Sequence, residues 1–256
     1  MLTANYHTHT PRCHHAKGEE REYIEKAIEM GFKTLGFADH SPQFYTTDFV
    51  SNMRMTPDDF PGYVDTLLKL KAEYRDKIDI LIGLETEYFP KSFGRLMDFL
   101  KDYPIDYLIL GQHQSFNEED GFYLGSPTGD PDWVKIYTDQ VVEGIKTNKF
   151  SYVAHPDLIN FHGDLKYYDL CMDRICKTAR EHDLPLEINL LGILGNRCYP
   201  NKRFWKIAKE NGNKAIIGVD AHWPDMLNCK ENYEKAMQLV NDLQLDLVDT
   251  IKLTMR

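Results

Sequence analysis

The sequence predicts an α/β fold, a TIM-like barrel of parallel β-strands surrounded by helices. Seven runs are strand candidates, and most of them are short, apolar on both faces and followed by a turn signal, which is typical of buried parallel strands. Amphipathic segments of helical period lie between these runs, at intervals of roughly thirty residues. The length of 256 residues fits one such barrel. Because no linker or internal repeat divides the chain, we expect residues 1–256 to form a single domain.

The expected elements alternate regularly along the chain. The strands cover residues 3–6, 34–38, 78–84, 107–111, 152–154, 185–189 and 215–219, with a weaker candidate at 249–253. The helices cover residues 19–30, 61–74, 131–147, 168–182, 202–211 and 231–243. Local chemistry sets the boundaries: Gly31 suits the residue after a helix, while Asp130 and Pro131 suit a cap and a first helical position. Trp133 and Tyr137 lie on the apolar face of the helix that follows, toward the core.

Composition argues against several classes of protein. Forty acidic residues against thirty basic ones give a formal net charge of −10, which disfavours a broad nucleic-acid-binding face. No apolar run approaches the ~20 residues of a membrane span, and the first residues lack the features of a signal peptide. The five cysteines have no CxxC spacing, as expected for reduced thiols, so we expect a cytoplasmic location. The oligomeric state is not indicated.

Ten histidines are present, and most of them follow the ends of the expected strands. An imidazole or carboxylate stands at six of the seven strand ends, with two further histidines in the first loop: His7 and His9, then His14 and His15, His40, Glu85, His113, His155, Asp220 and His222. Because the carboxyl ends of parallel barrel strands meet at one face, these side chains should converge there. Imidazoles with a few carboxylates suit Zn, Fe, Mn or Co rather than Ca.

The number of candidate ligands indicates more than one ion. Seven histidines, counting one of His14 and His15, make nine ligands together with Glu85 and Asp220. A single ion cannot use nine, so we expect two or three divalent ions. Glu85 is the only carboxylate of this set in the middle strands and is the expected bridging ligand. Such a cluster lowers the pKa of a bridging water, orients an oxyanion and stabilises a departing oxygen. Hydrolysis of a phosphate ester fits this chemistry.

The ordered ligand series resembles that of a known superfamily. His7-Thr8-His9-Thr10, His40, Glu85, His113, His155 and Asp220-Ala221-His222 resemble the motifs of the polymerase-and-histidinol-phosphatase (PHP) superfamily. Within it, the segment HTHTPRCHH near the start, Glu187-Ile188-Asn189 and Tyr199-Pro200 resemble the monofunctional histidinol-phosphatases. The match runs from the first expected strand to the seventh. The resemblance implies a distorted (β/α)7 barrel with a trinuclear metal site at the carboxyl ends of its strands.

The resemblance also implies how the ligands are shared. His15 rather than His14 is then the ninth ligand. One ion would be held by His7, His9, Glu85 and Asp220, a second by Glu85, His113 and His155, and a third by His15, His40 and His222.

Other residues are expected to hold the phosphate. Arginine binds phosphate bidentately, and Arg197, after the sixth strand, is the first candidate, followed by Arg54 in the long second loop. Relatives often carry a basic residue shortly after the fifth-strand histidine. Residues 158–162 contain no Arg or Lys, so His162 is the candidate substitute there. Asn189 is a candidate to contact the substrate or a site water.

Four residues near these candidates have a less specific interpretation. Asp39, beside His40, is either an orienting partner of a ligand or part of its strand. Glu187 is expected at most to stabilise the bottom of the barrel. Cys13 and Cys198 lie in loops at the same face, but no Cys-His-acid pattern makes either of them a nucleophile.

The leading hypothesis is a metal-dependent phosphomonoesterase that acts on L-histidinol phosphate in histidine biosynthesis. The expected nucleophile is a metal-bridging water or hydroxide, and Asp220 and His222 are the nearest candidates to protonate the leaving group. A related phosphoesterase acting on a nucleotide or a short oligonucleotide is the alternative, although the acidic segment 117–120 disfavours a polynucleotide. An amidohydrolase-like enzyme would often carry a lysine at the fourth strand, where Gln112 and His113 stand. A non-catalytic metal-binding protein is the last alternative.

Overall fold

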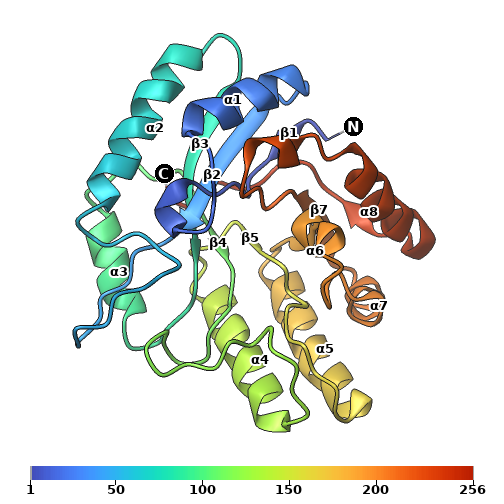
Figure 1. The fold of residues 1–256 in the computed structure, drawn as a ribbon. Helices are drawn as coiled ribbons and strands as arrows, with labels where there is room; N and C mark the ends of the chain where they lie inside the picture. Colours follow the sequence, from blue (N-terminus) through green and yellow to red (C-terminus); the bar gives the residue numbers. More distant parts are fainter. Residues whose placement is uncertain (1, 256) are drawn as a thin grey trace.

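The computed structural model describes residues 2–255, and one parallel sheet runs through them. The strands are β1 Ala4–Asn5, β2 Thr34–His40, β3 Asp79–Thr86, β4 Tyr107–Leu110, β5 Tyr152–Val153, β6 Leu186–Asn189, β7 Lys214–Gly218 and β8 Asp246–Leu247. Each strand pairs in parallel with the next one along the chain, so the sheet order is β1 to β8. Figure 1 shows the sheet curled on itself with helices around its outside. The predicted parallel α/β barrel is confirmed.

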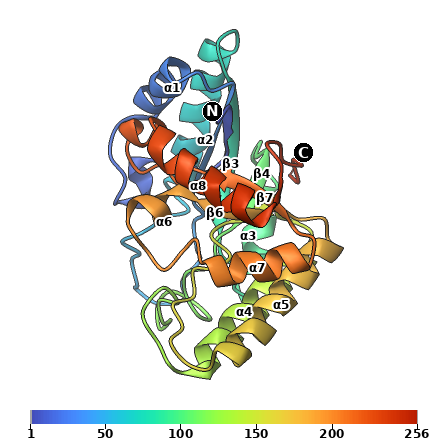
Figure 2. The same ribbon diagram turned by 90° about the vertical axis from the view of Figure 1, so that its right-hand side faces the viewer.

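Helices follow the strands and cover the outer face of the sheet. They are α1 Glu20–Glu29, α2 Phe60–Tyr74, α3 Phe93–Leu100, α4 Pro131–Lys146, α5 Leu165–Glu181, α6 Leu190–Leu194, α7 Lys202–Glu210 and α8 Lys230–Leu243, with the 3-10 turns η1 Pro11–Cys13 and η2 Pro224–Leu227. The side chain of Asp130 accepts a hydrogen bond from the backbone of Asp132, which caps α4 as the sequence predicts. Figure 2 shows α4, α5 and α7 lying side by side.

Three elements differ from the sequence prediction. The eight-residue helix α3 was not expected, because Gly94 and the nearby Pro90 weaken the local helix signal; buried Phe93, Leu96 and Leu100 stabilise it by packing. The short helix α6 was also missed. The last strand lies at Asp246–Leu247 rather than at 249–253, where the chain continues as a tail without regular secondary structure.

The sheet closes at the carboxyl ends of its strands. The segment that follows β1 pairs with the segment that follows β7 through a parallel bridge between Thr8 and Ala221. The backbone N–H of His9 donates to the carbonyl of Ala221 at 2.9 Å, and the N–H of Ala221 donates to the carbonyl of His7 at 3.1 Å. On the other side, the N–H of Ala38 donates to the carbonyl of Thr8 at 2.8 Å. Closure therefore occurs between two pairs of predicted ligands.

The apolar core has two compartments. The larger one fills the space between the sheet and the helices, and the smaller one lies inside the barrel around Tyr107 and Tyr152. Val248, Ile251 and Leu253 of the tail pack against this inner cluster. The tail runs past the amino ends of the strands, where the hydroxyl of Ser151 donates to the carbonyl of Lys252 at 2.6 Å. It therefore covers the end of the barrel opposite the ligands.

Within residues 2–255, every helix is too short or too polar to cross a membrane.

Tyr107 fills the inside of the barrel because its neighbours are glycines. Its phenol oxygen lies 2.7 Å from the carbonyl oxygen of Tyr6 and 3.2 Å from that of Phe37. A Cβ atom on Gly83 would overlap with the ring of Tyr107. The ring therefore occupies space that only glycine leaves free.

We expect Gly83→Ala to lower the free energy of unfolding by about 1–3 kcal/mol, because the added methyl group overpacks the barrel against Tyr107. Denaturant unfolding followed by circular dichroism measures the change. Gly62→Ala is the matched control: Gly62 is exposed in α2 and a Cβ there meets nothing within 4 Å, so that variant should be as stable as the parent or more stable. Equal stability of the two variants would contradict the packing argument.

Candidate metal centre

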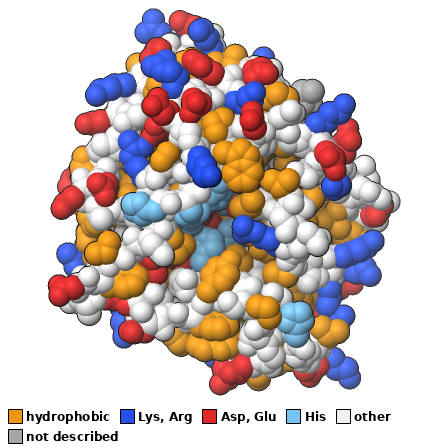
Figure 3. Space-filling view, in the orientation of Figure 1, with side chains coloured by type: hydrophobic (Ala, Val, Ile, Leu, Met, Phe, Trp, Pro, Cys, Tyr) orange, Lys and Arg blue, Asp and Glu red, His pale blue; other side chains and the backbone are white. Residues whose placement is uncertain are grey.

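A cavity of about 320 Å³ opens at the carboxyl ends of the strands. Seven predicted ligands line it, namely His9, His15, His40, Glu85, His113, Asp220 and His222. The rest of its lining is Met53, Tyr123, Leu191, Arg197, Tyr199 and Trp223. In Figure 3 histidine side chains lie at the bottom of a hollow that hydrophobic and basic side chains border. The remaining predicted ligands, His7 and His155, are buried and contact Glu85.

Glu85 lies at the centre of the histidines. The register of β2 and β3 places it opposite His40. Its Oε1 faces three imidazole nitrogens, Nε2 of His155 at 2.9 Å, Nε2 of His7 at 3.6 Å and Nε2 of His113 at 3.6 Å. Its Oε2 faces two others, Nδ1 of His40 at 3.1 Å and Nε2 of His9 at 3.5 Å. The two oxygens therefore face different groups of histidines, which is the arrangement a bridging carboxylate needs.

Asp220 forms a second centre of contacts beside Glu85. Its Oδ1 lies 3.1 Å from Nε2 of His9, 3.4 Å from Nε2 of His7 and 3.4 Å from Nδ1 of His222. Its backbone has φ +56°, in the left-handed region that few residues other than glycine adopt. Asn189 donates to the Oδ2 of Asp220 at 3.1 Å. The backbone and this hydrogen bond together direct Oδ1 toward the histidines.

The structure distinguishes the two histidines of the first loop. His15 lines the cavity, and its ring centroid lies 4.8 Å from that of His222 and 5.5 Å from that of His40. His14 is exposed with φ +64° at the end of η1 and does not line the cavity. The expectation that favours His15 therefore agrees with where the loop places the two rings.

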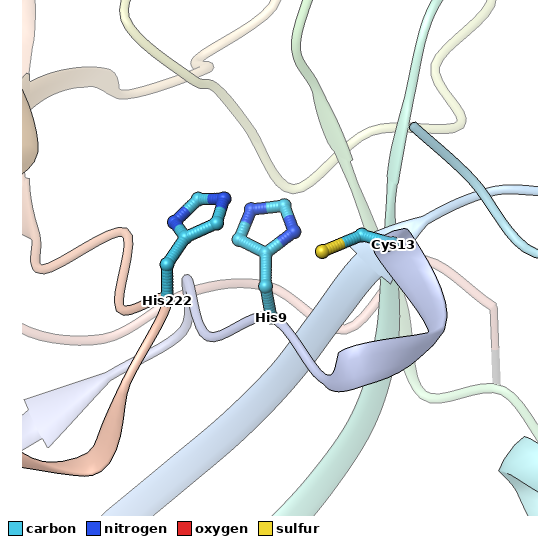
Figure 4. A group of neighbouring side chains, drawn as sticks. All are labelled: His9, Cys13 and His222. Atoms are coloured by element: carbon cyan, nitrogen blue, oxygen red, sulfur yellow. The ribbon is translucent and has the colours of Figure 1, made fainter. Parts of the chain in front are cut away.

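One member of the neighbourhood was not predicted as a ligand. Figure 4 shows His9 between His222 and Cys13, with the thiol directed toward His9. One ligand atom from each of these three residues lies within 4.8 Å of the others. The thiol also accepts a hydrogen bond from the backbone N–H of Ala16 at 3.3 Å. Cysteine can bind transition metals, and the position of Cys13 in the His-rich loop is the sequence signal for its place beside His9.

Carboxylates lie behind the histidines and orient them. Nδ1 of His7 lies 2.8 Å from the Oε1 of Glu187, which leaves the Nε2 of His7 directed at Glu85 and Asp220. Glu187 also accepts a hydrogen bond from the backbone N–H of His155 at 3.0 Å. Such partners fix the ring orientation and tautomer of a ligating histidine. Glu187 is thus tied to the ligands themselves, a role that the sequence did not indicate.

Asp39 and Glu87 have similar positions behind two other ligands. The Oδ1 of Asp39 lies 3.5 Å from Nδ1 of His9, so of the two interpretations of Asp39 the structure favours the orienting partner. Glu87 accepts a hydrogen bond from the backbone N–H of His113 at 3.0 Å. With Glu187, these two residues form a set that we call the outer carboxylates.

Burial and charge keep three of the ligands, Glu85, His113 and His222, in their metal-binding forms. Burial opposes ionisation of Glu85, but the neighbouring His113, His40 and His7 hold the pKa of Glu85 well below its usual range. Burial lowers the pKa of His113 to about 3 and, together with nearby His9, the pKa of His222 to about 3. These two imidazoles are therefore neutral near pH 7, and neutral imidazole is the form that binds metal.

The buried polar atoms of the cluster fit divalent cations. Among the described residues, Nε2 of His7, both ring nitrogens of His9 and Oδ1 of Asp220 are buried with no hydrogen-bond partner. Unpaired buried polar atoms are costly and uncommon in folded proteins. Imidazole and carboxylate donors facing one another at these distances are the donor set of Zn, Fe or Mn sites. Bound cations would satisfy these atoms together.

Four residues were predicted to contact the substrate, and only one of them lines the cavity. Arg197 does so, with its Nη1 donating to the phenol oxygen of Tyr199 at 2.7 Å. His162 is exposed and lies outside the cavity lining. Asn189 caps α6 and uses its amide nitrogen on Glu187 and Asp220, so its hydrogen-bonding groups serve the protein. Its contribution is to position Asp220.

Arg54 lies away from the cavity for an electrostatic reason. It is buried and forms ion pairs with Glu87 and with Glu118, and its Nη1 donates to the carbonyl of Ser41 at 3.1 Å. The positive charge of Arg54 is thus already paired with two carboxylates and is not left for a phosphate. Arg54 joins two loops at this face of the barrel through the same Glu87 that holds His113, and its guanidinium does not line the cavity.

The fold and this site place the chain in a known family. The chain belongs to the PHP domain family, whose model matches residues 5–190. It is 35% identical to a probable histidinol-phosphatase of Schizosaccharomyces pombe over 90% of this chain and 84% of that protein. It is 28% identical to a probable histidinol-phosphatase of Deinococcus radiodurans over 85% of each chain. The fold matches the crystal structure of a Lactococcus lactis histidinol phosphate phosphatase complexed with Zn, L-histidinol and phosphate. The TM-score is 0.77 and the identity 18%, and the match covers 100% of this chain and 98% of that chain.

We expect Arg54→Met to lower the free energy of unfolding by about 3–5 kcal/mol, because it leaves Glu87 in the interior without its charged partner. Thermal and denaturant unfolding measure the loss. Arg203→Met is the control, since Arg203 pairs with Asp169 at the surface, and its removal should change stability far less. If the two variants unfold alike, the buried ion pairs of Arg54 do not have the importance assigned to them.

Glu187→Gln should weaken metal binding by about 10–100-fold while the protein stays folded, because the ring of His7 loses its charged partner. Competition against a chromogenic chelator measures the affinity. The exposed Glu181→Gln at the end of α5 is the control and should bind metal like the parent. Unchanged affinity in Glu187→Gln would show that the outer carboxylate does not orient the ligand.

Proposed function

We propose that this protein is a metal-dependent phosphomonoesterase that hydrolyses L-histidinol phosphate to L-histidinol and phosphate. The observation that carries the proposal is the arrangement of histidines around the two oxygens of Glu85, with Arg197 in the lining of the same cavity. The named relatives in Schizosaccharomyces pombe and Deinococcus radiodurans support the choice of substrate.

The proposed ligands are His7, His9, His15, His40, Glu85, His113, His155, Asp220 and His222, and they would hold two or three Zn, Fe or Mn ions. Three groups of ligand atoms within 4.8 Å support more than one ion: His7 with His9 and Asp220, His7 with Glu85 and His155, and His9 with His40 and Glu85. These groups share members, as ligands of adjacent ions do. His40 groups with His9 and Glu85, whereas the resemblance implies that it shares an ion with His15 and His222.

The reaction adds water across a phosphorus–oxygen bond. The water oxygen bonds to phosphorus, the bond to the alkoxide of histidinol breaks, and a proton passes to that alkoxide. When bound, the divalent ions supply an activated water and positive charge for the phosphoryl oxygens. The guanidinium of Arg197 would bind two phosphoryl oxygens through its planar fork. Asp220 and His222, which line the cavity, are the proposed catalytic residues.

The cavity supports a small substrate. Its volume of about 320 Å³ lies at the lower end of the range of ligand pockets. The neighbouring cavity is lined by Glu118, Glu119 and Asp120, whose charge disfavours a polynucleotide. We therefore propose a small phosphate ester as the partner, with no nucleic acid or membrane. The single sheet that runs through the described chain supports the proposal of one domain. The five cysteines are free thiols, which supports a proposed location in the cytoplasm.

We expect the metal-loaded protein to release phosphate from L-histidinol phosphate faster than from nucleoside monophosphates or single-stranded DNA. Metal analysis with a phosphate-release assay on the same sample tests this. Asp220→Asn should stay folded and lose at least about a hundredfold in kcat, because it removes one ligand charge. Preferential turnover of a nucleotide would show that the substrate is a nucleotide rather than histidinol phosphate. Full activity of Asp220→Asn would show that Asp220 is not needed for the reaction.

A further inference from the structure

Two large aromatic side chains are exposed in the lining of the metal-centre cavity. Tyr123 is 41% exposed and Trp223 is 43% exposed, and both line the cavity together with the ligands. Aromatic side chains of this size contribute most when they are covered by a neighbour or a ligand. Exposed aromatic rings beside a polar centre are a typical feature of a binding surface for organic groups.

The backbone ties both aromatic residues to metal-ligand candidates. Trp223 directly follows His222, and its carbonyl accepts a hydrogen bond from the N–H of Met226 at 3.0 Å where η2 begins. Tyr123 pairs with Gln114 through an antiparallel bridge, and the N–H of the next residue, Leu124, donates to the carbonyl of His113 at 2.8 Å. The backbone of each aromatic residue is therefore fixed beside a metal-ligand candidate.

The charged residues of the cavity lining indicate which kind of organic group the two rings would bind. Among the described lining residues the carboxylates are Glu85 and Asp220, and both face histidines. A positively charged group on the organic part of a substrate therefore finds no uncommitted carboxylate in this lining. Aromatic faces attract such cations, and they also stack on flat rings. Met53 adds an apolar side chain to the same lining.

We propose that Tyr123 and Trp223 form the surface that recognises the organic part of the substrate and selects phosphate monoesters carrying a cationic or flat aromatic group. The inference rests on the proposed function, in which the phosphate lies at the metal centre. L-Histidinol phosphate has both features, an ammonium group and an imidazole ring. The metal centre and Arg197 recognise the phosphate, which all monoesters share, so selection among monoesters comes from the aromatic pair.

The test compares two esters of a primary alcohol, L-histidinol phosphate and glycerol 1-phosphate, with the metal-loaded protein. In Trp223→Ala and in Tyr123→Ala, the ratio of kcat/KM for histidinol phosphate to that for glycerol phosphate should fall by about 5- to 30-fold. The change should appear mainly in KM for histidinol phosphate. Trp223→Phe keeps an aromatic face and should recover most of the ratio.

Phe116→Ala is the matched control. Phe116 is 58% exposed and lines the neighbouring cavity rather than the metal centre, so its removal should leave the ratio unchanged. Metal content measured on every variant separates loss of the centre from loss of recognition. If the parent protein fails to hydrolyse histidinol phosphate, the proposed function is wrong. If the parent is active but both alanine variants keep its ratio, or lose activity equally on both esters, the aromatic pair does not select the substrate.

Discussion

The carboxylate of Glu85, buried among five imidazoles, is the interaction on which the rest of the structure depends. Its two oxygens face separate groups of histidines, and those histidines hold its pKa well below the usual range. A buried ionised group is stable only when it is paired. Divalent cations between these donors would pair with the carboxylate charge and with the lone pairs of neutral imidazoles at once. The formal net charge of −10 therefore describes the chain as a whole, whereas bound ions would make the centre attractive to an anionic ester.

The contact that closes the barrel also brings four of the proposed metal ligands together. Thr8 and Ala221 form the closing bridge. Thr8 stands between His7 and His9 in the sequence, and Ala221 stands between Asp220 and His222. A sheet that failed to close there would separate these four ligands. Small residues are equally necessary, because a Cβ on Gly111 would overlap with the carboxylate of Glu85. The barrel thus supplies both the convergence and the space.

Most of the fold and the set of ligand candidates could be predicted from local patterns. Alternating apolar runs and helical periods give the strand order. The parallel arrangement then brings Glu85, His113 and His155 together from strands that are distant in sequence. Local patterns do not indicate long-range partners: the guanidinium of Arg54 pairs with Glu118, 64 residues away, and does not line the cavity. The orienting role of Glu187 was missed for the same reason, because its partner His7 lies 180 residues away.

The sequence by itself determined the class of fold, the chemistry of the centre and the side chains that reach it from strand ends. It could do so because side-chain alternation along a strand and the common face of parallel strand ends are local and regular. Only the tertiary structure showed that His15 and Tyr123 line the cavity, whereas His14, Arg54 and His162 do not. Those outcomes depend on the path of loops, and a loop's path is set by the distant carboxylates and carbonyls with which it forms hydrogen bonds.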